Sequence, residues 1–100
     1  MLKSLRELYF QDNRLSIFPE PILKLRTLQI LSLGGNNLKT LPDTIHQLKS
    51  LRELRLSNNR LINLPDSFIQ LKSLQYINIE QNPFTNESID LNKLSRKEIF

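Results

Sequence analysis

Few residues in this chain could support chemistry, and they are scattered along it. The single histidine, His46, lies three positions after Asp43, and this spacing places two side chains on one face of a helical turn. Such a pair could hold a zinc ion loosely where two molecules touch. Because the chain has no cysteine and no second histidine to complete a ligand set, we predict an ordinary exposed histidine and no metal site.

Carboxylates are the other candidates for chemistry, and Glu53 and Glu80 are examples. A catalytic carboxylate needs surroundings that exclude water and shift its pKa, whereas the alternating sequence around these two residues predicts an open sheet. Glycine-rich phosphate-binding motifs and the HExxH metalloprotease motif are absent from the sequence. The sequence therefore predicts neither a catalytic residue nor a cofactor, and binding becomes the leading class of function.

A repeat of 23 residues positions all of these side chains. A leucine begins each of four copies, apolar residues follow at the fourth and sixth places, and an asparagine stands at the ninth. A fixed period of this length is typical of a solenoid, in which each repeat is one turn that packs only against its neighbours. The four copies begin at Leu5, Leu28, Leu51 and Leu74.

The first part of each repeat predicts a short strand. Leu54 and Leu56 alternate with Glu53 and Arg55, so the leucines point into the core and the charged side chains point outward. Neighbouring copies then place such strands side by side in a parallel sheet. The ninth-place asparagines come where the chain leaves the strand, and an amide side chain can bond backbone groups of its own turn and the next. We predict that they form a buried ladder of Asn13, Asn36, Asn59 and Asn82.

The second part of each repeat predicts a single helical or 3₁₀ turn. Apolar residues recur three places apart, and the first three copies begin this part with a proline, whose missing N–H has no cost there. An acid follows each proline and a base closes the segment, which is the arrangement that a helix dipole favours. These bases form a basic edge column. It either serves the dipole or binds an anionic partner, such as a sulfated glycan or an acidic protein segment: Lys3, Arg26, Lys49 and Lys72.

The pattern LxxLxLxxNxLxxLPxxIxxLxx resembles the 23-residue subclass of leucine-rich repeats found in bacterial repeat proteins and in Ras-pathway scaffolds. Its first half is complete in residues 28–38 and 51–61. The resemblance implies an α/β fold, a right-handed solenoid with a short parallel sheet of four or five strands on its concave face. Short helical, 3₁₀ or extended segments would form the convex face. It also implies a non-catalytic protein–protein interaction module that binds a partner through the concave face.

The outward positions of the predicted strands are therefore candidate partner contacts. Tyrosine and arginine are enriched at binding hot spots, although tyrosine also favours strands and Arg55 could instead pair with neighbouring glutamates. Gly34 and Gly35 either leave a shallow gap in this face or serve a turn that needs a permissive backbone. The candidates are Glu7, Tyr9, Ile30, Ser32, Glu53, Arg55, Tyr76, Asn78 and Glu80.

A single domain over residues 1–100 is predicted, with irregular ends. Lys97 stands where the next repeat would begin. We therefore predict a partial C-terminal cap over residues 92–100, in which Ile99 or Phe100 folds over the last turn. At the N-terminus the pattern begins at the last step of a repeat, and no polar cap precedes the first strand. Either copies of the chain associate through this uncovered end, or the chain is a piece of a longer array.

Composition narrows the partners and leaves the compartment open. The net charge is +4, but 10 acidic residues are interspersed among 14 basic ones, unlike the basic stripe of a nucleic-acid-binding domain. No apolar run approaches the ~20 residues of a membrane span, and the N-terminal residues lack the apolar core of a signal peptide. We predict another protein as the partner, with a homo-oligomer as the alternative. We predict no nucleic acid, no membrane span and a cytoplasmic location by default.

Overall fold

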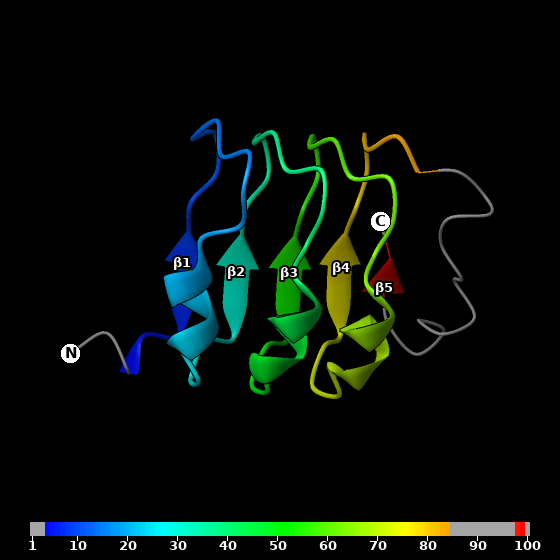
Figure 1. The fold of residues 1–100 in the computed structure, drawn as a ribbon. Coiled ribbons are helices and arrows are strands. Elements are labelled where there is room, and N and C mark those ends of the chain that lie inside the picture. The colour runs from blue at the N-terminus through cyan, green and yellow to red at the C-terminus, as the bar shows by residue number, and fades with distance from the viewer. Residues whose placement is uncertain (1–3, 85–97, 100) are drawn as a thin grey trace.

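The computed structural model describes residues 4–84 and 98–99, in which strands and 3₁₀ segments alternate. Figure 1 shows a row of short strands with the 3₁₀ segments lying over one face. The strands of this described part form one five-stranded sheet. In chain order the elements are β1 (Glu7–Tyr9), η2 (Glu20–Lys24), β2 (Ile30–Ser32), η3 (Asp43–Gln47), β3 (Glu53–Arg55), η4 (Asp66–Gln70), β4 (Tyr76–Asn78) and β5 (Glu98–Ile99).

The 23-residue period sets the register of the sheet. β1 to β4 pair in parallel and in chain order, so that Leu8, Leu31, Leu54 and Ile77 lie side by side. One row of apolar residues therefore faces the core from all four strands. The predicted fold, a solenoid with a short parallel sheet, is confirmed, and the segments opposite the sheet are 3₁₀ turns.

The last strand departs from this period by one residue. Glu98 pairs with Tyr76 and Ile99 pairs with Ile77, a step one residue shorter than the step between the other strands. Ile99 therefore extends the sheet as part of β5, because its backbone pairs with β4. The rest of the predicted cap, including Phe100, lies outside the described residues.

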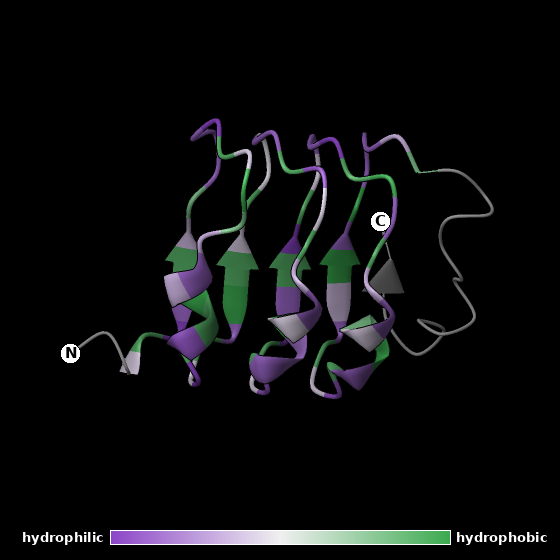
Figure 2. Ribbon diagram, in the orientation of Figure 1, coloured by the Kyte–Doolittle hydropathy of each residue, from purple (hydrophilic) through white to green (hydrophobic). Residues whose placement is uncertain are grey.

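The hydrophobic core lies between the sheet and the 3₁₀ layer. Leu31 and Leu54 on the strands are fully buried, and Ile45 and Phe68 are buried from the 3₁₀ side. Figure 2 shows hydrophobic residues along the strands and hydrophilic residues on the outside of the 3₁₀ segments. Truncating a buried leucine to alanine typically costs about 2–5 kcal/mol. Packing between successive turns is therefore what stabilises the array.

A proline directly precedes each of η2, η3 and η4. Pro19, Pro42 and Pro65 have φ angles of −70°, −70° and −65°, which suit a first helical turn. The carbonyl of each accepts a hydrogen bond from the N–H three residues later, as in the 2.9 Å bond from Phe68 N to Pro65 O. An acid follows each proline, as predicted, and lies at the positive end of the segment.

The 3₁₀ segments end earlier than the sequence predicts. η3 and η4 stop at Gln47 and Gln70, because the following Leu48 and Leu71 take ψ angles of 69° and 76°, outside the helical range. The bases predicted to close these segments lie one residue beyond these leucines, on the turns that lead into the next strands. They are exposed there, so they remain near the negative end of each segment and are also open to a ligand.

A left-handed residue precedes the asparagine in each turn out of a strand. The φ angle is 60° at Asp12, 68° at Gly35, 55° at Asn58 and 58° at Gln81. Glycine, asparagine and aspartate tolerate this conformation best, so three of the four repeats carry a suitable residue. At Gly35 a Cβ would overlap Oδ1 of the Asp12 side chain. The left-handed backbone therefore favours glycine there, and a side chain would also require Asp12 to move, which agrees with the predicted need for a permissive turn.

Candidate binding surfaces

Three of the ninth-place asparagines each join two turns of the solenoid. In Asn36, Oδ1 accepts hydrogen bonds from the backbone N–H of Asn13 at 3.0 Å and of Leu15 at 2.9 Å. Its Nδ2 donates to the carbonyl of Leu33 in its own repeat at 2.9 Å and to that of Phe10 in the preceding repeat at 3.2 Å. The side chain thus supplies partners for backbone groups that the turn takes out of the sheet.

The same bonds recur one and two turns further along. Nδ2 of Asn59 donates to the carbonyl of Leu33 at 2.9 Å, and Nδ2 of Asn82 donates to that of Leu56 at 2.8 Å. The bonds therefore run from each turn to the preceding one, whereas the prediction had them run to the next. The asparagines hold neighbouring strands in register at the point where the strands end.

The predicted ladder is buried only in its middle. Asn36 and Asn59 are 4% and 8% exposed, but Asn13 is exposed and Asn82 is half-buried. The prediction of four buried asparagines is wrong for these last two. They lie in the first and last repeats that the structure describes, and each of these repeats packs against only one other fully described repeat.

The side chains that point away from the core form what we term the open sheet face. They lie in register across the strands, on the side opposite the 3₁₀ layer. All the sequence-predicted contacts lie on or just beyond these strands. They are exposed (Glu7, Tyr9, Arg55, Glu80), half-buried (Ile30, Glu53, Tyr76, Asn78) or buried (Ser32).

Ser32 corrects the predicted contact surface, since only 7% of it is exposed. It lies in register between Tyr9 on β1 and Arg55 on β3. Both neighbours carry much longer side chains, so the short serine between them keeps little accessible surface. A partner that approaches this face would meet Tyr9 and Arg55 before it could reach Ser32.

Arg55 is the centre of a cluster on the open sheet face. Its Nε lies 2.6 Å from Oε2 of Glu53, and its Cζ lies 5.2 Å from the centre of the Tyr76 ring. Glu53 and Tyr76 are themselves paired in register on β3 and β4. The hydrogen bond to the Glu53 carboxylate raises the pKa of Arg55. The guanidinium is thus held by a carboxylate and an aromatic ring, which is the internal pairing that the sequence left open.

A second polar contact lies on the edge strand β1. The hydroxyl of Tyr9 donates to Oε1 of Glu7 at 3.0 Å, while 54% of the tyrosine remains exposed. The hydrogen bond to Glu7 raises the pKa of Tyr9 above its ordinary value. Tyr9 therefore presents its ring to solvent while a neighbour on the same strand holds its hydroxyl.

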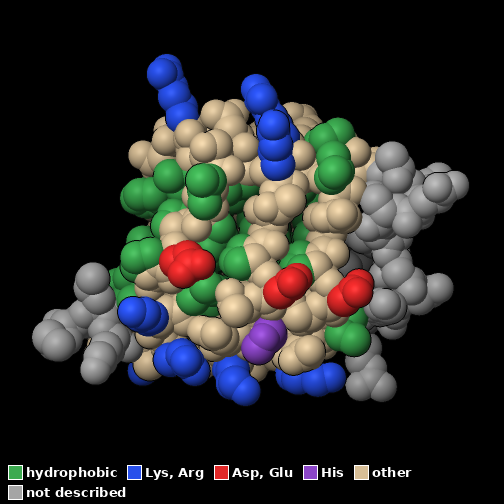
Figure 3. Space-filling model, in the orientation of Figure 1, with side chains coloured by type: hydrophobic (Ala, Val, Ile, Leu, Met, Phe, Trp, Pro, Cys, Tyr) green, Lys and Arg blue, Asp and Glu red, His purple; other side chains and the backbone are tan. Residues whose placement is uncertain are grey.

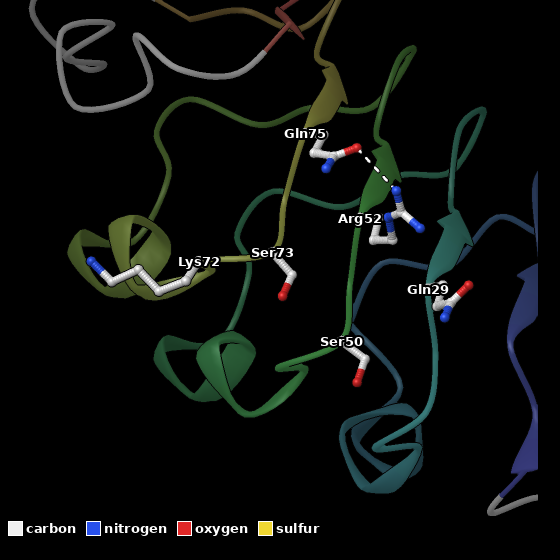
Figure 4. Close-up of a pocket in the computed structure, with 6 residues that line it drawn as sticks. All are labelled: Gln29, Ser50, Arg52, Lys72, Ser73 and Gln75. Atoms are coloured by element: carbon white, nitrogen blue, oxygen red, sulfur yellow. Dashed lines mark hydrogen bonds between the residues drawn. The ribbon is translucent and has the colours of Figure 1, made fainter.

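An open pocket of about 360 Å³ lies at the edge of the sheet where the strands begin. Its lining residues come from the turns just before β2, β3 and β4 (Figure 4). All are polar or charged, and Nη2 of Arg52 donates to Oε1 of Gln75 at 3.4 Å. Sequence inspection missed this pocket, although the polar residues that recur before each strand are a signal for it. The lining consists of Gln29, Ser50, Arg52, Lys72, Ser73 and Gln75.

The predicted basic edge column runs along the same edge. Arg26, Lys49 and Lys72 are exposed between the 3₁₀ segments and the strands, whereas Lys3 lies outside the described residues. Figure 3 shows Lys and Arg side chains along this edge and a row of acidic side chains across the 3₁₀ face. Of the described members of the column, Lys72 lines the pocket and the other two do not.

His46 lies in η3 without a set of metal-ligating neighbours. It is half-buried, whereas the sequence predicted an exposed residue, because η3 is packed between η2 and η4. Residues 4–84 and 98–99 hold no group of three or more side chains that could bind a metal ion. In the same described residues, no helix has the length and apolar character needed to cross a membrane.

The N-terminal end of the sheet leaves apolar side chains partly uncovered. Leu5, Leu8 and Leu15 are half-buried and Phe10 is 37% exposed, whereas Leu28, the counterpart of Leu5 one turn later, is fully buried. Among the described strands, β1 pairs with β2 alone. The apolar side chains at this end are therefore of the kind that a neighbouring repeat covers elsewhere in the array.

Comparisons with known proteins agree with this geometry. The model of the family described as "leucine rich repeat" matches residues 3–61 and 26–84. A search of curated protein sequences found no significant match. Among solved structures, a leucine-rich repeat protein of Leptospira interrogans is 39% identical over 96% of this chain, with a TM-score of 0.89, and this chain spans 25% of that protein. On the period, the parallel sheet and these matches together, the chain belongs to the leucine-rich repeat family.

Proposed function

We propose that this chain is a protein-interaction module that binds its partner through the open sheet face. Membership of the leucine-rich repeat family supports a protein-interaction module in general. The choice of face comes from the side chains described above. An interface of standard size buries about 800 Å² on each partner, so a partner would have to contact most of this short sheet.

The cluster of Glu53, Arg55 and Tyr76 is the observation that carries the choice of face. Arginine and tyrosine are enriched among residues that dominate binding energy. The Arg55 side chain is 46% exposed and is already held by Glu53 at 2.6 Å and by the Tyr76 ring at 5.2 Å. A side chain that is fixed before binding loses less conformational entropy on binding than a free one.

The charges on this face favour contact over long-range attraction. Glu53 balances the charge of Arg55, and the hydroxyl of Tyr9 is already bonded to Glu7. We therefore expect the partner to bind by packing on the two tyrosine rings and by hydrogen bonds around Arg55. The proposal involves no reaction, because these titratable groups lie on an open surface.

Affinity capture from a native extract tests the proposal. The wild-type chain should retain a stoichiometric protein partner, and Tyr76→Ala or Arg55→Ala should reduce its recovery at least about five-fold, as expected for a hot-spot side chain. Ile69→Ala is the matched control, since it removes an exposed apolar side chain from the opposite, 3₁₀ face. Recovery that ignores Tyr76→Ala and Arg55→Ala, or that falls with Ile69→Ala, would exclude the open sheet face.

Self-association is a second candidate, and the partly uncovered N-terminal end favours it. An edge strand with apolar neighbours is a template for pairing with another copy, and Phe10 is 37% exposed beside it. Light scattering over a range of concentrations should then show a mass that rises with concentration in the wild type and stays monomeric in Phe10→Lys. A wild-type chain that stays monomeric at high concentration would exclude this alternative.

A further inference from the structure

We propose that the pocket at the edge of the sheet binds an acidic saccharide, that is, a sugar bearing sulfate or carboxylate groups. The pocket is separate from the open sheet face, so this proposal does not depend on the protein partner. Figure 4 shows Lys72 at one side, with its ammonium group directed outward, and Gln29 at the other, with Ser50 and Ser73 between them. Each lining side chain can donate a hydrogen bond, and among the described lining residues none carries a carboxylate.

Among the described residues, neither cation of the pocket has an acidic side chain as an ion-pair partner. Arg55 and Glu53 form the one ion pair found within the described residues. Neither Arg52 nor Lys72 forms an ion pair there. Arg52 donates one N–H to Gln75 at 3.4 Å, which leaves further guanidinium N–H groups for a ligand. Arginine and lysine both bind sulfate and carboxylate through charge-assisted hydrogen bonds.

The remaining lining favours a sugar over other anions. Two amides and two hydroxyls line the pocket together with the cations, and such groups pair with the hydroxyls of a sugar ring as both donors and acceptors. A volume of about 360 Å³ is within the range of small-molecule sites. Binding of single-stranded nucleic acid relies on aromatic side chains that stack on bases, and the described lining has none.

A repeated motif extends this polar surface beyond the pocket. Serine or threonine directly precedes the first leucine of each repeat, and arginine or glutamine directly follows it. The pocket is therefore one part of a polar strip along the edge where the strands begin, and such a strip suits an extended ligand such as an oligosaccharide. The strip consists of Ser4, Thr27, Ser50 and Ser73, with Arg6, Gln29, Arg52 and Gln75.

Titration with a heparin-derived tetrasaccharide, followed by amide NMR spectra, tests the proposal on the intact chain. We expect saturable shifts centred on Ser50, Arg52 and Gln75, with binding that weakens as salt is raised. An uncharged tetrasaccharide and inorganic sulfate, used as separate probes, should each bind at least about five-fold more weakly, because the first lacks the anionic groups and the second lacks the sugar.

Lys72→Gln and Lys49→Gln form a matched pair of variants. Both remove one lysine charge from the same place of the repeat, but Lys72 lines the pocket and Lys49 does not. Lys72→Gln should weaken tetrasaccharide binding about five-fold, as for one charged contact at an exposed site, and Lys49→Gln should leave it nearly unchanged. The amide spectrum of each variant shows that it is folded.

Three results would overturn the proposal. Equal weakening by the two variants would mean attraction to net charge alone. Amide shifts at Arg26 and Lys49, with none at the residues that line the pocket, would also mean attraction to net charge alone. Inorganic sulfate that binds as tightly as the tetrasaccharide would show that the site does not recognise a sugar.

Discussion

Asparagine side chains replace backbone partners wherever the chain leaves the sheet. Asn59 accepts from the N–H of Leu38 at 3.0 Å and donates to the carbonyls of Leu33 and Leu56 at 2.9 and 3.1 Å. Because Asn59 is 8% exposed, water cannot easily replace it in these bonds, whereas water has access to Asn13. The contribution of an asparagine to stability therefore depends on its place in the array.

Asn59→Ala should lower the free energy of unfolding by about 2–4 kcal/mol, since buried backbone groups left unpaired cost roughly 1–3 kcal/mol each. Asn13→Ala removes the same amide from an exposed turn and should cost less than about 1 kcal/mol. Urea-induced unfolding followed by circular dichroism measures both changes. Equal losses in the two variants would contradict the difference in burial that the structure describes.

Tyr9 should titrate above the ordinary tyrosine pKa, because its hydrogen bond to Glu7 stabilises the protonated hydroxyl. A pKa raised by folding adds stability that is complete below the unfolded pKa, about 10 for tyrosine, and is lost as pH rises through the folded pKa. NMR titration should show that Glu7→Ala lowers the pKa of Tyr9, while Glu80→Ala leaves it unchanged. An unaltered pKa in Glu7→Ala would mean that the hydrogen bond is not formed in solution.

Single residues show where prediction from the sequence stops. The alternation of the strands placed Arg55 and Tyr76 correctly on the face opposite the core. It did not predict that Ser32 is buried, because that depends on the lengths of Tyr9 and Arg55 across the register. The left-handed φ of 58° at Gln81 also escapes the sequence, since the repeat geometry imposes it on a residue that does not favour it.

Each 3₁₀ segment contributes one buried face and one exposed face to the outer layer. In η4, Phe68 is 2% exposed and Ile69 beside it is 41% exposed. Phe68→Ala should therefore cost about 3–5 kcal/mol, and Ile69→Ala, which changes the next residue, should cost less than about 1 kcal/mol. Thermal or urea unfolding gives both values. Similar losses at the two positions would mean that the segment does not pack as described.

The elements were more predictable than their ends. The period of 23 residues predicts four strands, their parallel pairing and their register, because each turn must stack on the previous one. It does not predict that η3 and η4 stop at Gln47 and Gln70, which the backbone angles of the following leucines determine. Nor does it fix the position of β5, the fifth strand that the family resemblance allowed, where a shorter step pairs Ile99 with Ile77 and the sequence no longer follows the repeat motif.

The molecule as a whole is a slab of 41 × 29 × 20 Å whose surfaces differ in chemistry. The open sheet face carries the tyrosines and the Arg55 cluster, and the 3₁₀ face carries a row of acids (Figure 3). The pocket lies on the edge between them, at the start of the strands. A protein and an acidic saccharide could therefore occupy the molecule together, and Lys72→Gln should leave protein capture unchanged.

Site-specific photo-crosslinking measures most directly whether the open sheet face binds a partner. Photoreactive p-benzoylphenylalanine would replace Tyr9 or Asn78 on this face, and Ile69 on the 3₁₀ face, in separate samples of the folded chain exposed to native extract. Asn78 lies in register with Arg55, so its probe is next to the cluster. We predict a crosslink to one protein from position 78 or 9 and none from 69. A crosslink from position 69 alone would contradict the assignment of the binding face.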